Sequence, residues 1–159
     1  MNAVRPRGHE FKVGRIGFCA SASFLSVRLP SGRRLRYPKA LIEWTTPKWD
    51  SATRVASVTY VAGMGATAVG TSVYRKSMWG GVFAQHANQA LAADLLLGAM
   101  VRLDEAGMPL VLTAHDEIVI EVPIGSEHES TVRDLMCQSP AWAEGIPIAA
   151  EGFTTTRYC

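Results

Sequence analysis

Three residues suited to metal or proton chemistry stand together in the segment LTAHDEIVIEVP: His115, Asp116 and Glu117. Apolar, β-forming residues precede and follow them. A carboxylate at such a junction is partly desolvated, so it is costly unless a cation or a hydrogen bond compensates it. Mg²⁺ is a natural compensator, because it takes one or two carboxylates from a protein and completes its shell with water and substrate phosphate. The same residues also suit a β-turn, which favours Asp, so both interpretations stay open here.

A one-metal nuclease built on Asp116, Glu117 and Glu121 is a weaker interpretation of the same segment. Glu121 follows Glu117 by four residues along an extended strand. The two side chains then share a face but lie roughly 13 Å apart at the rise of a strand. That separation disfavours a shared ion.

The elements that must position these residues are two strands and a preceding helix. Strands are expected over residues 110–114 and 118–122, joined at His115-Asp116-Glu117. A long helix is expected over residues 82–105, because its apolar residues recur at intervals of three and four. Gly107 and Pro109 would end that helix.

Two further elements are expected after the second strand. Ser126 and Glu129 match a capping box, which predicts a helix from there to about Gln138. Residues 146–152 can add a terminal strand, and Pro147 would confine that strand to the edge of a sheet.

The first half of the chain is expected to be rich in β-structure. Residues 13–37 are expected to be extended, because apolar and polar side chains alternate over residues 25–29 and 35–37, on either side of the turn sequence Pro30-Ser31-Gly32-Arg33. Residues 38–52 are expected to be mostly irregular, and residues 57–62 and 71–78 to form a second hairpin around the glycine-rich segment between them. The sequence thus predicts an α+β fold, in which two helices back one face of an antiparallel sheet.

Length and composition favour one compact domain. The chain has 159 residues and is 48% hydrophobic, which is enough to bury a core. No run approaches the roughly 18 apolar residues of a membrane span, and the basic first residues lack the apolar core of a signal peptide. The three cysteines and four histidines show neither a disulfide framework nor zinc-ligand spacing. The sequence therefore predicts a cytoplasmic protein with no membrane partner.

Charge is distributed unevenly along the chain. Residues 1–39 hold nine Lys and Arg against the single acid Glu10, whereas the remaining residues hold seven basic and thirteen acidic side chains. A ribbon that presents several guanidinium groups adds affinity for nucleic acid independently of sequence, although it can also dock on an acidic partner. The arginines of the expected hairpin are the candidates for such contacts: Arg28, Arg33, Arg34 and Arg36.

Ordered segments along nearly all of the chain resemble the C-terminal palm of the phage type of family A DNA polymerases. The segment NQALAADLLLGAM resembles the helix that precedes motif C in that family, and LTAHDEIVIEVP resembles the motif C hairpin. Upstream, RLPSGRRLRYP and MWGG resemble a hairpin and a Tyr/Trp-Gly-Gly element, and residues 140–158 resemble the terminal strand and tail. The resemblance implies a single partial palm domain over 1–159, with a basic β-rich part over 1–79 and the helix and hairpin elements over 80–159.

The same resemblance implies roles for particular residues. Asp116 would bind the catalytic Mg²⁺ ions, His115 would lie beside the primer terminus, and Glu117 would assist the metal site or its water shell. Gln89 would contact the duplex near the primer end. Nucleotidyl transfer of this kind uses two metal ions about 3.5–4 Å apart. The implied partners are primer–template DNA and dNTP, and the implied setting is a bacterial host cell, with the gene carried by a phage or prophage.

Two elements of the family have no counterpart in these 159 residues. The motif A strand, which supplies a second metal-binding aspartate, and the fingers helix of motif B are both absent. One carboxylate-bearing turn cannot hold two Mg²⁺ ions by itself. We therefore expect this chain to be inactive alone, as one chain of a split or truncated enzyme whose second polypeptide supplies motif A and fingers. The alternative is a palm-derived module that binds DNA or protein without catalysis.

Overall fold

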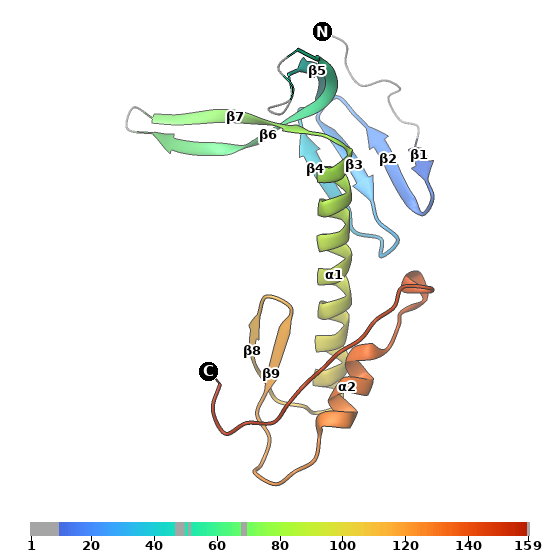
Figure 1. The fold of residues 1–159 in the computed structure, drawn as a ribbon, viewed down its shortest axis with the longest axis vertical. Helices are drawn as coiled ribbons and strands as arrows, with labels where there is room; N and C mark the ends of the chain where they lie inside the picture. Colours follow the sequence, from blue (N-terminus) through green and yellow to red (C-terminus); the bar gives the residue numbers. More distant parts are fainter. Residues whose placement is uncertain (1–9, 47–49, 51, 68–69, 159) are drawn as a thin grey trace. The chain divides into compact units, whose positions relative to one another are not determined.

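The structure is a computed structural model that describes residues 10–46, 50, 52–67 and 70–158, without side chains over 64–73. The predicted α+β class is confirmed, because the described strands pair antiparallel and two α-helices accompany them (Figure 1). The strands form three separate sheets. The chain divides into two compact units, Met1–Asn88 and Gln89–Cys159, and the division falls inside the long helix α1 (Gly80–Glu105). That 1–159 is one domain stays a prediction.

The first unit contains a four-stranded antiparallel sheet in the order β1-β2-β3-β4. The strands are β1 (Glu10–Val13), β2 (Ile16–Ala20), β3 (Phe24–Arg28) and β4 (Arg34–Pro38). Alternate residues of β3 and β4 are buried, including Leu25, Val27 and Tyr37, and Leu29 after β3 is fully buried. The predicted arginine-rich hairpin is therefore confirmed as β3–β4.

A second sheet of the same unit has the order β5-β6-β7, with strands β5 (Leu41–Thr45), β6 (Val55–Thr67) and β7 (Gly70–Met78). The second predicted hairpin is confirmed as β6–β7, although β6 continues through the glycines with a bulge between Val61 and Gly63. The prediction that 38–52 is mostly irregular was wrong at β5. This strand exists because β6 offers it a pairing edge, a partner that local sequence does not reveal.

A polar network joins the strands of the second sheet. The Arg75 guanidinium donates to the Thr59 hydroxyl at 2.8 Å and to the carbonyl of Lys39 at 3.0 Å. The Thr59 hydroxyl in turn donates to Glu43 at 2.5 Å. Since Thr59 is nearly fully buried, these bonds satisfy polar groups that water cannot reach.

The first turns of α1 pack on the four-stranded sheet. Phe83 meets Tyr37 edge to face, with 5.4 Å between the ring centroids, and the Tyr37 hydroxyl lies 3.1 Å from Nδ1 of His86. Burial raises the pKa of Tyr37 to about 12. Aromatic packing and one hydrogen bond therefore fix the start of the helix.

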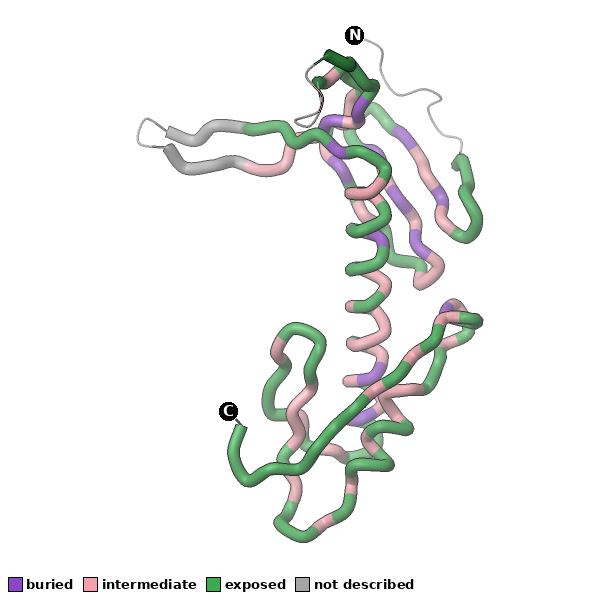
Figure 2. The backbone as a smooth tube through the Cα atoms, in the orientation of Figure 1, coloured by how far each residue is buried: buried purple, intermediate pink, exposed green. Residues whose placement is uncertain are grey.

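The second unit holds the rest of α1, the hairpin of β8 (Leu110–Ala114) and β9 (Glu117–Ile120), the helix α2 (Glu129–Cys137) and a short 3₁₀ turn over Ala141–Ala143. Nε of Arg102 on α1 donates to the carbonyl of Leu135 on α2 at 2.8 Å. Leu103 is fully buried, whereas no residue of β8 or β9 is (Figure 2). The core of this unit therefore lies along α1.

Two local predictions in the second unit were wrong. No capping box forms, because α2 begins at Glu129 after His128, and the Ser126 hydroxyl donates back to the carbonyl of Pro123 instead. Residues 146–152 form no strand in the part of the chain that the structure describes. Pro147 lacks an N–H for ladder pairing, and in this unit β8 and β9 bond to each other alone.

Substitution of glycine by alanine should change stability in opposite directions at Gly98, inside α1, and at Gly107, just after its end. Gly107 has φ +73°, and its N–H donates to the carbonyl of Asp104 at 2.9 Å, so Gly107→Ala should cost about 1 kcal/mol. Gly98 lies inside the helix, where alanine is favoured by about 1 kcal/mol. No atom lies within 4 Å of the added Cβ at 107, and at 98 the nearest is the flexible Arg102 Nη1 at 3.4 Å. Urea unfolding should give free-energy changes of opposite sign; changes of the same sign would contradict this account.

Candidate metal and nucleic-acid site

His115 and Asp116 form the two-residue turn of the β8–β9 hairpin. Ala114 pairs with Glu117, so the two residues between them stand at the tip, and the confirmed strands bring His115, Asp116 and Glu117 together as expected (Figure 1). The ladder shifts register once, between Leu110 and Leu112. The second strand differs from the prediction at both ends, since β9 begins at Glu117, which was expected in the turn, and ends at Ile120, two residues early.

His115 has a left-handed backbone conformation, with φ +54°. The favoured two-residue hairpin turns require positive φ at their first central residue, a position at which glycine is common. A side chain there costs about 1–2 kcal/mol, although His tolerates the region better than most residues. The tight connection therefore explains the conformation of His115, and it leaves the imidazole exposed.

Asp116 is exposed at the same tip. Among the residues that the structure describes, none forms a hydrogen bond or an ion pair with its carboxylate. Both carboxylate oxygens are thus available to a cation or to a donor from another molecule.

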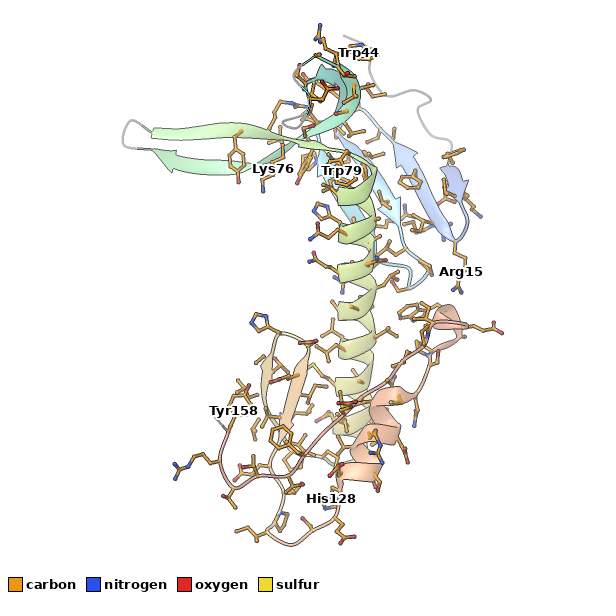
Figure 3. The ribbon with its side chains drawn as sticks, viewed as in Figure 1. Arg15, Trp44, Lys76, Trp79, His128 and Tyr158 are labelled. Carbon is orange, nitrogen blue, oxygen red and sulfur yellow. The ribbon has the colours of Figure 1, made fainter. Side chains whose placement is uncertain are left out.

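Glu117 is held by the terminal segment of the chain. The hydroxyl of Tyr158 donates to Oε2 of Glu117 at 3.0 Å, and this bond raises the pKa of Tyr158 because it favours the neutral phenol. Figure 3 labels Tyr158 in the C-terminal segment, close to the hairpin. On its way, that segment passes the start of α2, where a Cβ at Gly152 would lie 4.0 Å from Glu129. The sequence did not predict this contact, because it joins positions 41 residues apart in a segment without regular structure.

The residues at the tip fit Mg²⁺ as part of a site. Asp116 offers oxygen donors of the kind that Mg²⁺ prefers, and Glu117 stands next to it with one oxygen already accepting from Tyr158. Over the described residues, no group of three or more His, Cys, Asp or Glu side chains could hold a metal ion. The chemistry of the donors therefore suits an ion whose remaining ligands come from water, substrate or another protein segment.

The predicted nucleic-acid contacts lie away from the hairpin in the sequence. Gln89 is exposed on α1. Arg34 and Arg36 are exposed on β4, Arg33 precedes them in the turn, and the guanidinium of Arg36 lies 5.9 Å from the ring centroid of Phe24. Arg28 differs, because it forms a two-point ion pair with Glu10 at 2.7 and 2.8 Å.

Fold and site together describe an α+β protein that presents an exposed carboxylate, Asp116, at a hairpin tip. The chain is 35% identical over 141 residues to a protein named "DNA polymerase" from Bacillus phage SP02. The match covers 89% of this chain and 20% of that protein, so the chain spans about one fifth of the length of its relative. This similarity supports a relationship to a portion of a DNA polymerase. No protein-family model and no solved structure matches the chain.

None of the helices that the structure describes could span a membrane. Even α1, with its 26 residues, contains no stretch apolar enough to cross a bilayer.

Proposed function

We propose that this chain is the C-terminal palm portion of a family A DNA polymerase of the phage type, with the β8–β9 hairpin as its motif C. Asp116 binds catalytic Mg²⁺, His115 adjoins the primer terminus, Glu117 supports the water shell of the metal, and Gln89 contacts the duplex. When bound, Mg²⁺ stabilises the charge that develops on the reacting phosphate and activates the attacking oxygen.

The observation that carries the proposal is the Asp116 carboxylate, exposed at a hairpin tip without a partner among the described side chains. A structural aspartate of a turn commonly accepts from a nearby backbone N–H, but among the described residues no backbone N–H donates to the Asp116 carboxylate. Similarity to the Bacillus phage SP02 DNA polymerase supports the same assignment. The ligands that complete the site belong to a segment outside these 159 residues, on a second polypeptide or on a longer one.

The arginines of the β3–β4 hairpin belong to the proposal as contacts to the DNA backbone. Arg33, Arg34, Arg36 and Arg28 are grouped on one ribbon, and such a group supplies affinity that does not depend on base sequence. These contacts would hold primer–template DNA while dNTP is added at the hairpin.

A second candidate function is a DNA-binding module without catalysis. It is favoured by the lack of a three-ligand metal group in the described residues, together with the arginine-rich ribbon. The two functions differ in metal dependence, because a binding module needs no Mg²⁺.

The test replaces the matched segment of the Bacillus phage SP02 DNA polymerase with this chain, and we call the product the hybrid polymerase. The hybrid should extend a labelled primer on a template in the presence of Mg²⁺, whereas the isolated chain should not. A hybrid that folds and binds primer–template yet never extends it would overturn the polymerase assignment and favour the binding module. Robust primer extension by the isolated chain would contradict the proposal that these 159 residues hold only part of the metal site.

A further inference from the structure

One face of the β1–β4 sheet carries a row of cations across the strands. Lys12 pairs with Gly17, Gly17 with Arg28, and Arg28 with Arg34, so these four positions line up across all four strands. We call Lys12, Arg28 and Arg34 the basic row. Strand spacing makes it about 15 Å long. Arg36, two residues along β4 from Arg34, lies on the same face, opposite to the buried side chains of that strand.

The carboxylate of Glu10 occupies the middle of this row. Glu10 pairs with Cys19, two residues along β2 from Gly17, but its side chain lies over Gly17 and reaches Arg28. A Cβ at position 17 would lie 2.7 Å from Cδ of Glu10, and Gly17 is buried. The missing side chain at Gly17 is therefore what lets the carboxylate lie between Lys12 and Arg28.

The cations of the row act together on this carboxylate. The hydrogen bond from Arg28 is the largest influence that lowers the pKa of Glu10, and the charges of Arg28, Lys12 and Arg34 lower it further. Glu10 is also the single acid among residues 1–39, against nine Lys and Arg. A carboxylate and a phosphate both accept two parallel bonds from a guanidinium, so Glu10 stands where a phosphate would bind.

We propose that this face binds the phosphodiester backbone of a nucleic acid strand through Lys12, Arg28, Arg34 and Arg36, and that Glu10 is an internal competitor which the backbone displaces from Arg28. A linear row of cations fits a linear polyanion better than a single anion. The exposed ring of Phe24, beside Arg36, adds a surface on which a base can stack. The inference rests on the proposed DNA contacts of the arginines and adds Lys12 and Glu10 to them.

The experiment measures binding of a fluorescein-labelled single-stranded DNA to the full chain by anisotropy over a range of salt. Glu10→Gln should bind about fivefold more tightly at low salt. The magnitude of the slope of log Kobs against log salt should rise by about 0.7, because one more phosphate contact forms. Glu127→Gln makes the same charge change at an exposed loop position outside this face and should leave both quantities near wild type.

Further variants separate the possible failures. Adding Arg28→Gln to Glu10→Gln should remove the gain, and Glu10→Ala should reproduce it, with circular dichroism as the check on folding. If Glu10→Gln and Glu127→Gln bind the labelled DNA with equal affinity, Glu10 does not compete with the DNA backbone for Arg28. Unchanged binding by the Arg34→Gln/Arg36→Gln variant overturns the arginine contacts themselves and leaves the role of Asp116 intact. If Glu10→Gln raises the affinity for labelled polyglutamate as much as the affinity for DNA, the face does not select nucleic acid, and the proposal is overturned.

Discussion

Asp116→Asn is expected to lower Mg²⁺-dependent primer extension by the hybrid polymerase about a thousandfold. Asparagine keeps the size of the side chain but loses the charge, and a metal's stabilisation of a reacting phosphate is worth several kcal/mol. About 4 kcal/mol corresponds to a factor of roughly a thousand in rate. Since Asp116 is exposed at a turn and bonded to no described side chain, the thermal midpoint should hardly change.

The matched control is Asp134→Asn, which makes the same change at an exposed position of α2. It should leave extension within about twofold of the unsubstituted hybrid, in line with the small effect of surface changes away from special features. Rates should be measured in single turnover over a range of Mg²⁺, so that a weakened metal site is separated from a lost one. Equal rates for Asp116→Asn and Asp134→Asn would remove Asp116 from the catalytic role.

Leu103→Ala is expected to destabilise the second unit by about 3 kcal/mol. Leu103 has no solvent-exposed surface, and removal of a buried leucine side chain costs about 2–5 kcal/mol through lost transfer energy and the cavity left behind. The change also falls in the last turns of α1, where the carbonyl of Leu103 accepts the N–H of Met108 at 2.9 Å. Urea unfolding followed by far-ultraviolet circular dichroism measures the loss.

Val101→Ala provides the control on the same helix. Val101 is 56% exposed, so its truncation should change the free energy of unfolding by no more than about 0.5 kcal/mol. A comparable loss of unfolding free energy for both variants would show that the burial of Leu103 does not stabilise the second unit. The core of that unit would then not lie along α1.

The hairpin that carries the candidate site could be predicted because its signals are local. Two apolar runs flank three polar residues, and that spacing predicts two strands joined at a turn that carries Asp116. The long helix could be predicted for the same reason, since its periodic apolar residues and the terminating Gly107 lie within one segment. The strand β5 escaped prediction because its pairing with β6 joins separate segments, and the expected capping box failed because Ser126 had a nearer acceptor in Pro123.

The basic character of the first 39 residues was evident from composition, but the state of each arginine was not. Arg28 was predicted simply as one cation of a DNA-binding group. The register of β1 against β2 pairs Glu10 with Cys19 on the face that carries Gly17 and Arg28, and from there the carboxylate reaches Arg28. Likewise, Tyr158 reaches Glu117 because the terminal segment runs past α2 instead of joining a sheet.

The sequence by itself determined the α+β class, the hairpin with Asp116 at its tip and the concentration of positive charge, because each depends on neighbouring residues or on composition. Tertiary structure alone decided which of these charges are engaged: Asp116 stays without a described partner, while Glu117 and Arg28 are bound by Tyr158 and Glu10. The physical reason is that ion pairs and hydrogen bonds act over a few ångströms. Strand register and the path of the chain bring distant residues within that reach, and neither can be derived from spacing along the sequence.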